Sequence, residues 1–316
     1  MVRIGWFASI AWLGLAGAID AHAQCVTTAG SPASFGTVGS FDVENTPQAS
    51  SSSDAGVSCN GGTLVLLTTN RIEGTLTSAN NGSLVGPTGD KIAYAVYADS
   101  SHSTLVKFGT PYNWADTQFV NVLGLFGNGG ETPLPLYLQT VAGSVVAAGT
   151  YSDTLTIAWS WSICDAGVTA LCTATSTGSG VATIPVTLVV SNDCRITAPD
   201  VGFGAAAAVT QFLPVTGGVS LVCTKGMTYT VGLSSGAQPA ANGRRQMANG
   251  ANTLQYDIYS GGTGTVWGET SNRVSSAGAA DGVTGQSFPY TASIYTDQPT
   301  PPVGVYTDTV VVDVRY

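Results

Sequence analysis

The chain has 316 residues, which is long enough for two domains of about 150 residues each. Its 40 glycines and its few charged residues are typical of a secreted, β-rich protein. The net charge of −9 argues against a nucleic-acid partner, because nucleic acids are bound by basic surfaces.

The first residues predict a secretory signal peptide. A positively charged start at Arg3 is followed by the apolar run 4–19 and by the small residues Ala21 and Ala23. We therefore expect residues 1–23 to be removed before Gln24 and the rest of the chain to be secreted. Because secreted proteins fold under oxidising conditions, the six cysteines are expected to form disulfides rather than to act as reactive thiols.

The two halves of the chain repeat the same order of motifs. The segment CVTTAGSPASFGTV begins at Cys25, CRITAPDVGFGAAA begins at Cys194, and a second cysteine follows each roughly thirty residues later. The copies continue with YAVYADS against YDIYSGG, a single tryptophan, and GTYSDT against GVYTDT. The disulfides that the repeat predicts are Cys25–Cys59, Cys194–Cys223 and, closing a short loop, Cys164–Cys172.

The last motif of each copy begins a strand with one buried face. From Leu155 to Ile163, and again from Val310 to Tyr316, every second residue is apolar or aromatic. Many such short runs are separated by Gly, Pro, Asn and Ser, and no helical period is evident. The pattern predicts an all-β fold of two tandem antiparallel β-sandwiches, with an N-terminal domain over 24–191 and a C-terminal domain over 192–316.

The first copy has a strand that the second copy lacks. In SGVATIPVTLVVSNDC, residues 179–194, alternate apolar residues predict a strand over 181–190 that completes the first sandwich. The second copy shows no counterpart after Tyr316, so we expect its sandwich to keep an open apolar groove that accepts a strand from another chain. The residues expected to fill the first sandwich are Ile184, Val186, Leu188 and Val190.

The order of these motifs resembles the spore coat protein U domain family, found in subunits of archaic chaperone–usher pili. The resemblance rests on the paired cysteines, the FG dipeptides at Phe35 and Phe203, the Y-x-x-Y strands, and the G-x-Y-x-D-T segments at Gly149 and Gly304. It implies incomplete immunoglobulin-like sandwiches. It also implies three partners: a periplasmic pilus chaperone, an outer-membrane usher, and a next pilin subunit that donates its N-terminal strand.

The start of the chain bears on its place in such a fibre. A stalk subunit of this family carries an apolar donor segment before its first cysteine, whereas only Gln24 separates the expected cleavage site from Cys25. A subunit that accepts a strand and donates none is expected at the distal end of the pilus, on the bacterial cell surface. The resemblance therefore implies a tip adhesin that supports attachment and biofilm formation.

Three connections of the first domain are expected at the pole farthest from the second domain: 70–90, 121–134 and 161–180. Each combines apolar residues with glycine, which predicts an exposed contact surface for a target that the sequence does not identify. The alternative is that these side chains are the inward-facing ends of strands, and both interpretations stay open for Trp161. The candidate surface-binding residues are Leu84, Val85, Leu123, Leu125, Phe126, Trp161, Ile163, Val168 and Leu171.

The sequence offers no catalytic constellation. Beyond the signal peptide it has one histidine, His102, and its glutamates are scattered, so no triad or metal cluster is predicted and neither an enzyme nor a cofactor is expected. Asp153 recurs as Asp308, which favours a structural role for both. Two alternatives to an adhesin stay open: a minor or initiating pilin subunit that binds no target, and a soluble secreted carbohydrate-binding or hydrolytic β-sandwich protein.

Overall fold

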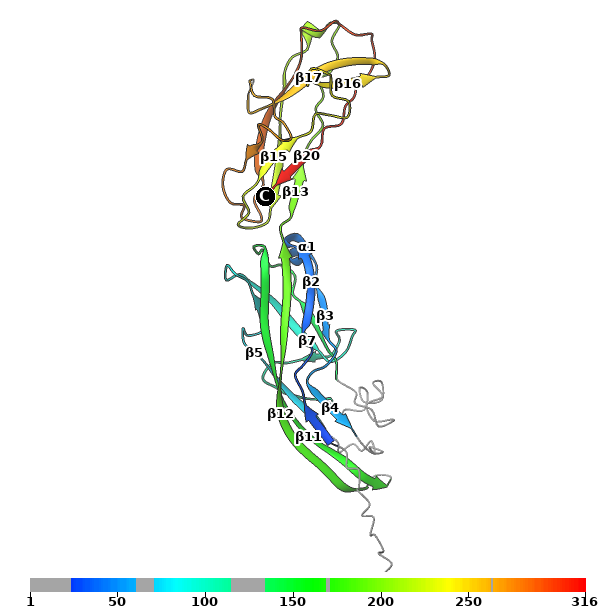
Figure 1. Ribbon diagram of the computed structural model, residues 1–316, viewed down its shortest axis with the longest axis vertical. Coiled ribbons are helices and arrows are strands. Elements are labelled where there is room, and N and C mark those ends of the chain that lie inside the picture. Colours follow the sequence, from blue (N-terminus) through cyan, green and yellow to red (C-terminus); the bar gives the residue numbers. More distant parts are fainter. Residues whose placement is uncertain (1–23, 61–70, 115–133, 169–170, 263) are drawn as a thin grey trace, which may run out of the picture.

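The computed structural model describes residues 24–60, 71–114, 134–168, 171–262 and 264–316. These residues form an elongated molecule in which two β-rich bodies stand end to end (Figure 1). Each body has its own hydrophobic core, the first drawn from residues between Ala33 and Val190 and the second from residues between Cys194 and Val314. We call these bodies domain one and domain two. No helix in the described ranges is both long and apolar enough to cross a membrane.

In the described residues strands make up most of the regular structure, together with one short α-helix and one turn of 3-10 helix. The elements of domain one are β1 (Gln24–Thr27), β2 (Ala33–Gly39), α1 (Ser40–Asn45), β3 (Ala49–Ser52), β4 (Val57–Asn60), β5 (Arg71–Ser78), β6 (Ser83–Val85), β7 (Lys91–Tyr97), β8 (Leu105–Val106), β9 (Pro111–Asn113), β10 (Leu136–Thr140), β11 (Gly149–Val168) and β12 (Leu171–Ser191). Those of domain two are β13 (Cys194–Thr197), η1 (Val209–Gln211), β14 (Val215–Cys223), β15 (Thr230–Leu233), β16 (Arg245–Asn249), β17 (Asn252–Ser260), β18 (Val274–Ser275), β19 (Gln286–Ile294) and β20 (Val312–Arg315).

A long hairpin of β11 and β12 runs the length of domain one. Gly149 pairs with Val190 at the end near domain two, and Val168 pairs with Leu171 at the far end (Figure 1). The strands of the largest sheet follow the order β2-β12-β11-β6-β7-β10-β3, and β5 also pairs with β11. Because side chains alternate along each strand, the inward faces of these strands enclose one continuous core.

The C-terminal half of β12 is the strand that completes domain one, as predicted. Its alternate residues Ile184, Val186, Leu188 and Val190 are all buried. Burying four such side chains contributes on the order of 6–12 kcal/mol before the entropy of ordering the strand is subtracted. β12 pairs antiparallel with β11 and parallel with β2, so the β2–β12 ladder differs from the antiparallel pairing that was predicted for the sandwich.

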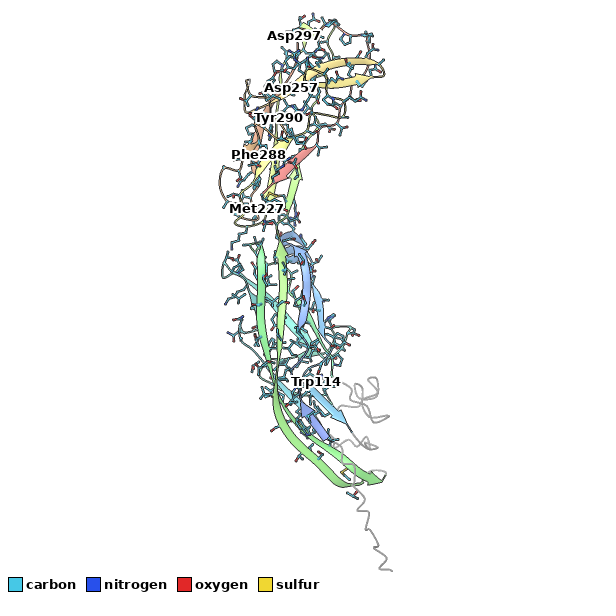
Figure 2. All side chains as sticks on the ribbon, in the orientation of Figure 1. Trp114, Met227, Asp257, Phe288, Tyr290 and Asp297 are labelled. Atoms are coloured by element: carbon cyan, nitrogen blue, oxygen red, sulfur yellow. A yellow bond between two sulfur atoms is a disulfide. The ribbon has the colours of Figure 1, made fainter. Side chains whose placement is uncertain are left out.

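Domain two has the same all-β character with less regular edges. Its five-stranded sheet has the order β13-β14-β19-β17-β16, and its three-stranded sheet has the order β18-β15-β20. Figure 2 shows Met227, Phe288 and Tyr290 within this domain, and all three side chains are buried. Two tandem β-sandwiches, the second without a final strand in the described residues, therefore confirm the predicted fold class.

The tyrosine that recurs in the two G-x-Y-x-D-T segments makes the same contact in each domain. The hydroxyl of Tyr151 donates to the carbonyl oxygen of Ala147 at 2.7 Å, and that of Tyr306 donates to the carbonyl oxygen of Pro302 at 2.7 Å. Both acceptors lie four residues before the tyrosine, a local contact similar to the tyrosine corner of immunoglobulin-like sandwiches. The repeat in sequence is therefore a repeat in structure.

The recurring aspartates have a structural role in both domains, as predicted. The hydroxyl of Tyr94 donates to Asp153 at 2.6 Å, and that of Tyr256 donates to Asp308 at 2.7 Å. Burial and the neighbouring carboxylate raise the pKa of each tyrosine well above its ordinary value, so both phenols remain donors at neutral pH. The two carboxylates therefore tie strands together in both domains.

Replacing Asp153 by alanine is expected to lower the free energy of unfolding of domain one by about 3 kcal/mol. Asp153 is 5% exposed and also accepts hydrogen bonds from Ser78 and from the backbone N–H groups of Asn80 and Thr154, so its loss leaves several donors unpaired. Hydrogen exchange of the domain-one amides measures the change. The exposed Asp42→Ala is the control, and an equal loss in both variants would show that the buried network is not responsible.

Two of the three predicted disulfides are confirmed. Cys164 is bonded to Cys172 near the turn of the β11–β12 hairpin, and Cys194 is bonded to Cys223 between β13 and β14. Cys25 and Cys59 are direct Cα partners in the β1–β4 ladder. The third pairing stays a prediction, with the two residues in the register that it requires.

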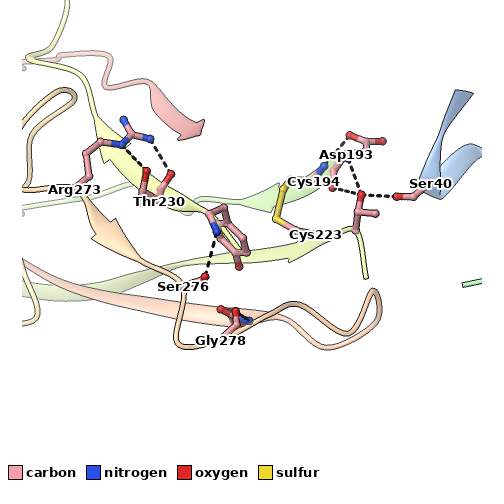
Figure 3. The surroundings of a disulfide bond; sticks show 11 residues. Ser40, Asp193, Cys194, Cys223, Thr230, Arg273, Ser276 and Gly278 are labelled. Carbon is pink, nitrogen blue, oxygen red and sulfur yellow. Dashed lines mark hydrogen bonds between the residues drawn. A yellow bond between two sulfur atoms is a disulfide. The ribbon is translucent and has the colours of Figure 1, made fainter. Parts of the chain in front are cut away.

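The joint between the domains contains a buried hydrogen bond. The hydroxyls of Ser40 in α1 and Thr224 after β14 lie 2.7 Å apart. Thr224 also accepts a hydrogen bond from the backbone N–H of Asp193, in the short link that joins the domains. Figure 3 shows Ser40 beside the segment that carries Asp193 and Cys194, so the joint adjoins the Cys194–Cys223 disulfide.

Charged side chains surround this hydrogen bond. Lys225 of domain two lies 2.6 Å from Asp90 of domain one, and this hydrogen bond holds the pKa of Asp90 below its ordinary value. The guanidinium of Arg195 stacks 3.9 Å from the ring centre of Phe41 and lies 3.5 Å from Glu44. At the joint, domain one therefore supplies the carboxylates and domain two the cations.

Candidate functional site: the open groove of domain two

Domain two has a groove of about 360 Å³ beside its last segment. Residues 198–203 form one wall, and residues 306–310 form the other. Met247 of β16, with Tyr256 and Ile258 of β17, lies between the walls. The groove is therefore partly apolar and bounded on both sides by extended chain.

The corresponding place in domain one is occupied by β12. Val186 of β12 pairs with Ala33 of β2 on one side and with Asp153 of β11 on the other. By the repeat, Val201 corresponds to Ala33 and Asp308 corresponds to Asp153, and both line the groove. The groove of domain two is thus the space that a strand equivalent to β12 would fill.

The side chains on the groove walls are less buried than their counterparts. Tyr151 and Leu155 are fully buried in domain one, whereas Tyr306 and Val310 are only half-buried. Next to them Val311 is 60% exposed. The apolar face that β12 covers in domain one is therefore still accessible in domain two.

The backbone of the walls also lacks its neighbour. β2 forms a seven-residue strand against β12, whereas its copy at 201–207 forms no strand in the described structure. β11 pairs along its whole length, whereas the matching segment becomes a strand only at β20, against β15. Before β20 this segment makes only a single antiparallel bridge in the described residues, between Thr307 and Ala248 of β16. An extended segment with so little strand pairing, beside an apolar floor, fits a site that binds an added β-strand.

A buried ion pair holds the two strands that form the floor of the groove. Arg245 of β16 and Asp257 of β17 are 2% and 4% exposed and lie 3.0 Å apart. Arg245 also donates to the carbonyl oxygens of Leu233, Ser234 and Trp267, so its guanidinium is well satisfied. Figure 2 shows Asp257 in the body of domain two. The repeat gives no signal for this pair, because domain one has Ala95 where YDIY has Asp257.

Leu84 and Val85 do not lie at the far pole predicted for them. Leu84 is fully buried, and the exposure predicted for it is wrong. Val85 is half-buried and pairs with Ser152, near the end of β11 that adjoins domain two. The turn that follows leads to Asp90, which contacts Lys225. Because β6 and β7 form a short hairpin here, this part of 70–90 lies at the joint and not at the far pole.

Trp161 and Ile163 are also buried, at 9% and 1% exposure, so for them the interpretation as inward-facing strand residues is correct. Trp161 lies directly opposite Gly178 in the β11–β12 ladder. A Cβ atom on Gly178 would come within 2.4 Å of the Trp161 ring, so the glycine makes room for the indole. The alternation of β11 therefore continues into the core to Ile163.

The remaining candidates are only partly covered by the structure. Val168 and Leu171 are backbone partners at the last rung of the β11–β12 hairpin, and their side chains lie outside the described residues. Leu123, Leu125 and Phe126 lie wholly outside the described residues. The predicted location of the 161–180 connection, at the end of domain one away from domain two, agrees with the hairpin in Figure 1.

The sequence predicts the open groove, and two of its lining residues, Phe203 and Asp308, belong to motifs named above without being candidates for the site. Val201 and Phe203 belong to the FG motif of the second copy, and Tyr306 and Asp308 belong to its G-x-Y-x-D-T segment. Aligning both motifs with domain one would have placed them beside the missing strand. In the described ranges no group of three or more His, Cys, Asp or Glu side chains is arranged to hold a metal ion.

A family model for the spore coat protein U domain matches residues 14–158 and 181–313. The matched residues cover most of the sequence, and the chain belongs to this family. The first match ends within β11, and the second begins within β12, ahead of Cys194. No curated protein sequence gives a significant match.

Solved structures give a second comparison. The chain is similar to a chain of the CsuC–CsuE chaperone–tip adhesion subunit pre-assembly complex from archaic chaperone–usher Csu pili of Acinetobacter baumannii, with 25% identity and a TM-score of 0.66. That similarity covers 93% of this chain and 100% of the other. The CupB6 tip adhesin from Pseudomonas aeruginosa is a weaker match, with 12% identity, a TM-score of 0.33, and coverage of 93% and 94%.

Proposed function

We propose that the chain is the tip subunit of a chaperone–usher pilus and that its domain two accepts the N-terminal strand of the following subunit. The observation that carries this proposal is the groove between residues 198–203 and 306–310, whose counterpart in domain one is filled by β12. A pilin strand with alternate apolar residues would supply the missing ladder. The similarity to a tip adhesion subunit complex supports the assignment to the tip.

This function implies a route and a set of partners. A periplasmic chaperone would cover the groove after secretion, and an outer-membrane usher would exchange the chaperone for the donor strand. An uncovered groove would expose apolar side chains and free backbone groups, which favour aggregation. The subunit would finally stand at the pilus tip on the cell surface, where attachment supports biofilm formation.

Domain one would carry the adhesive surface at its far end. Of the residues predicted for that surface, Leu123, Leu125, Phe126, Val168 and Leu171 stay candidates, whereas the buried Leu84, Trp161 and Ile163 do not. The hairpin of β11 and β12 reaches that end of the molecule and is braced by the Cys164–Cys172 disulfide. A braced hairpin loses less conformational entropy on contact with a surface than a free loop does.

Replacing Leu125 and Phe126 by serine is expected to reduce attachment of piliated cells at least tenfold, because the substitutions remove apolar contact area at the target. The matched control is Val141→Ser, which changes a 54% exposed valine of the same domain near the joint. Attached cells are counted after the amount of pili has been measured for each strain. Full attachment by the double variant would favour a tip subunit that binds no target.

A further inference from the structure

Domain one ends in a surface that receives domain two. Val146 and Ala147 of domain one are buried, at 3% and 7% exposure. Ala147 forms a β-bridge with Lys225, and a Cβ atom on Gly282 would lie within 2.6 Å of Val145. The segment 145–147 is therefore a part of domain one that contacts domain two.

The repeat locates the equivalent surface on domain two. Tyr151 and Tyr306 donate to the carbonyls of Ala147 and Pro302, so these two acceptors occupy the same structural place. Pro302 is exposed, whereas Ala147 is buried. Beside Pro302, Val303 is 105% exposed and Val305 is 80% exposed. By this equivalence residues 300–302 are the copy of 145–147, and the exposed Val303 and Val305 follow directly after that copy.

The direction of the completing strand leads to the same surface. β12 passes Gly149 as it leaves domain one and continues through Asp193 into domain two. A strand bound in the groove with the same register would leave domain two beside Gly304, the counterpart of Gly149. Gly304 lies between Val303 and Val305. The folded domain that follows the donated strand in the partner chain would therefore lie next to these two valines.

The two surfaces differ in charge. The domain-one side of the joint offers Asp90 and Glu44 to cations of domain two. At the matching end of domain two, where Figure 2 shows Asp297, the carboxylate of Asp297 is already bound by Arg244 at 2.7 Å. Asp297 is therefore paired within domain two, and the exposed Val303 and Val305 are the expected contact for a neighbouring domain.

We propose that the exposed end of domain two around Pro302, Val303 and Val305 contacts the folded domain of the following subunit, and we call this contact surface the seat. The contact between domains one and two would then have an equivalent between neighbouring subunits. The proposal rests on the proposed function, because it assumes that the groove receives a donated strand. It adds a second contact, made by the body of the partner and not by its N-terminal strand. The partner surface that fits is apolar and carries no required basic residue.

Site-specific photo-cross-linking in the native host tests this proposal. The photoreactive amino acid p-benzoylphenylalanine is placed in the full chain at one of three positions, and cross-linked peptides from purified pili are identified by mass spectrometry. The positions are Val303 at the proposed seat, Thr309 on the groove wall, and Val181 on the outer face of domain one as a control. We expect position 309 to capture the N-terminal segment of a pilin and position 303 to capture the folded domain of the same pilin.

The outcomes separate the two proposals. Two results would contradict the proposed contact at Val303 and leave the proposed function in place. One is capture of a pilin from position 309 but not from position 303, and the other is capture from position 303 at the N-terminal segment only. If no pilin is captured from either position, both proposals are contradicted.

Val303→Asp is expected to reduce the amount of this chain in purified pili about tenfold, because a carboxylate would have to be buried without a partner. Val181→Asp is the matched control, and an equal reduction by both variants also overturns the seat.

Discussion

Appending a second copy of residues 181–191 after Tyr316, through a short glycine- and serine-rich linker, is expected to raise the Tm of domain two by roughly 10 °C. The copy can run antiparallel to residues 306–312, as β12 runs against β11. In that register its Leu188 lies opposite Tyr306 and its Ile184 lies opposite Val310. A net gain of about 2–3 kcal/mol, after the entropy of ordering the strand, is enough for such a shift.

The control for this experiment is the same appended segment with Val186→Asp and Leu188→Asp in the copy. It has the same length and the same backbone groups, but it cannot fill the apolar floor formed by Met247 and Ile258. Scanning calorimetry of the full chain resolves the transition of domain two from that of domain one. An equal shift with both copies, or no shift with the unaltered one, would rule out the groove as a strand acceptor.

Arg245→Met is expected to lower the free energy of unfolding of domain two by about 3–5 kcal/mol. The substitution leaves the carboxylate of Asp257 buried with the hydroxyl of Tyr295, at 2.9 Å, in place of a cation. It also leaves carbonyl oxygens of Leu233 and Trp267 without the donor that now satisfies them. Met247 of β16 and Ile258 of β17 form the floor of the groove. The appended strand should therefore raise the Tm of this variant less than that of the unaltered chain.

The neighbouring Arg244 is the matched control for Arg245. Its partner Asp297 is 61% exposed, so water replaces the lost ion pair and Arg244→Met should change stability far less. Denaturant titration of both variants gives the comparison. A double variant with Arg245→Met and Asp257→Leu should recover part of the lost stability, since it removes the unpaired charge. Equal effects at positions 244 and 245 would contradict the role assigned to the buried pair.

Periodicity predicted the strands of this chain well where one face of the strand is buried along its whole length. The period of two from Leu155 to Ile163 is that of β11, and the period from Ala182 to Val190 is that of β12. The internal repeat then predicted two confirmed disulfides and the structural role of Asp153. These features depend on local pattern and on comparison of one copy with the other.

The candidate surface was predicted less well, because alternation does not reveal which end of a strand a loop occupies. Leu84 was placed at the far pole, but the short β6–β7 hairpin turns the chain back towards domain two. Trp161 was a candidate for exposure, but Gly178 on the neighbouring strand leaves room for its ring in the core. Both errors concern contacts between residues far apart in the sequence.

The all-β class, the two copies, and the strand that one copy has and the other lacks can be predicted from the sequence, because each of them is a pattern along the chain. The position of β12 between β2 and β11, parallel to one and antiparallel to the other, is visible only in the folded domain. The tertiary structure also places the matching open groove of domain two over Met247, Tyr256 and Ile258. The physical reason is that a strand is stabilised by the neighbours on both of its edges, and neighbours are chosen by the packing of the whole domain.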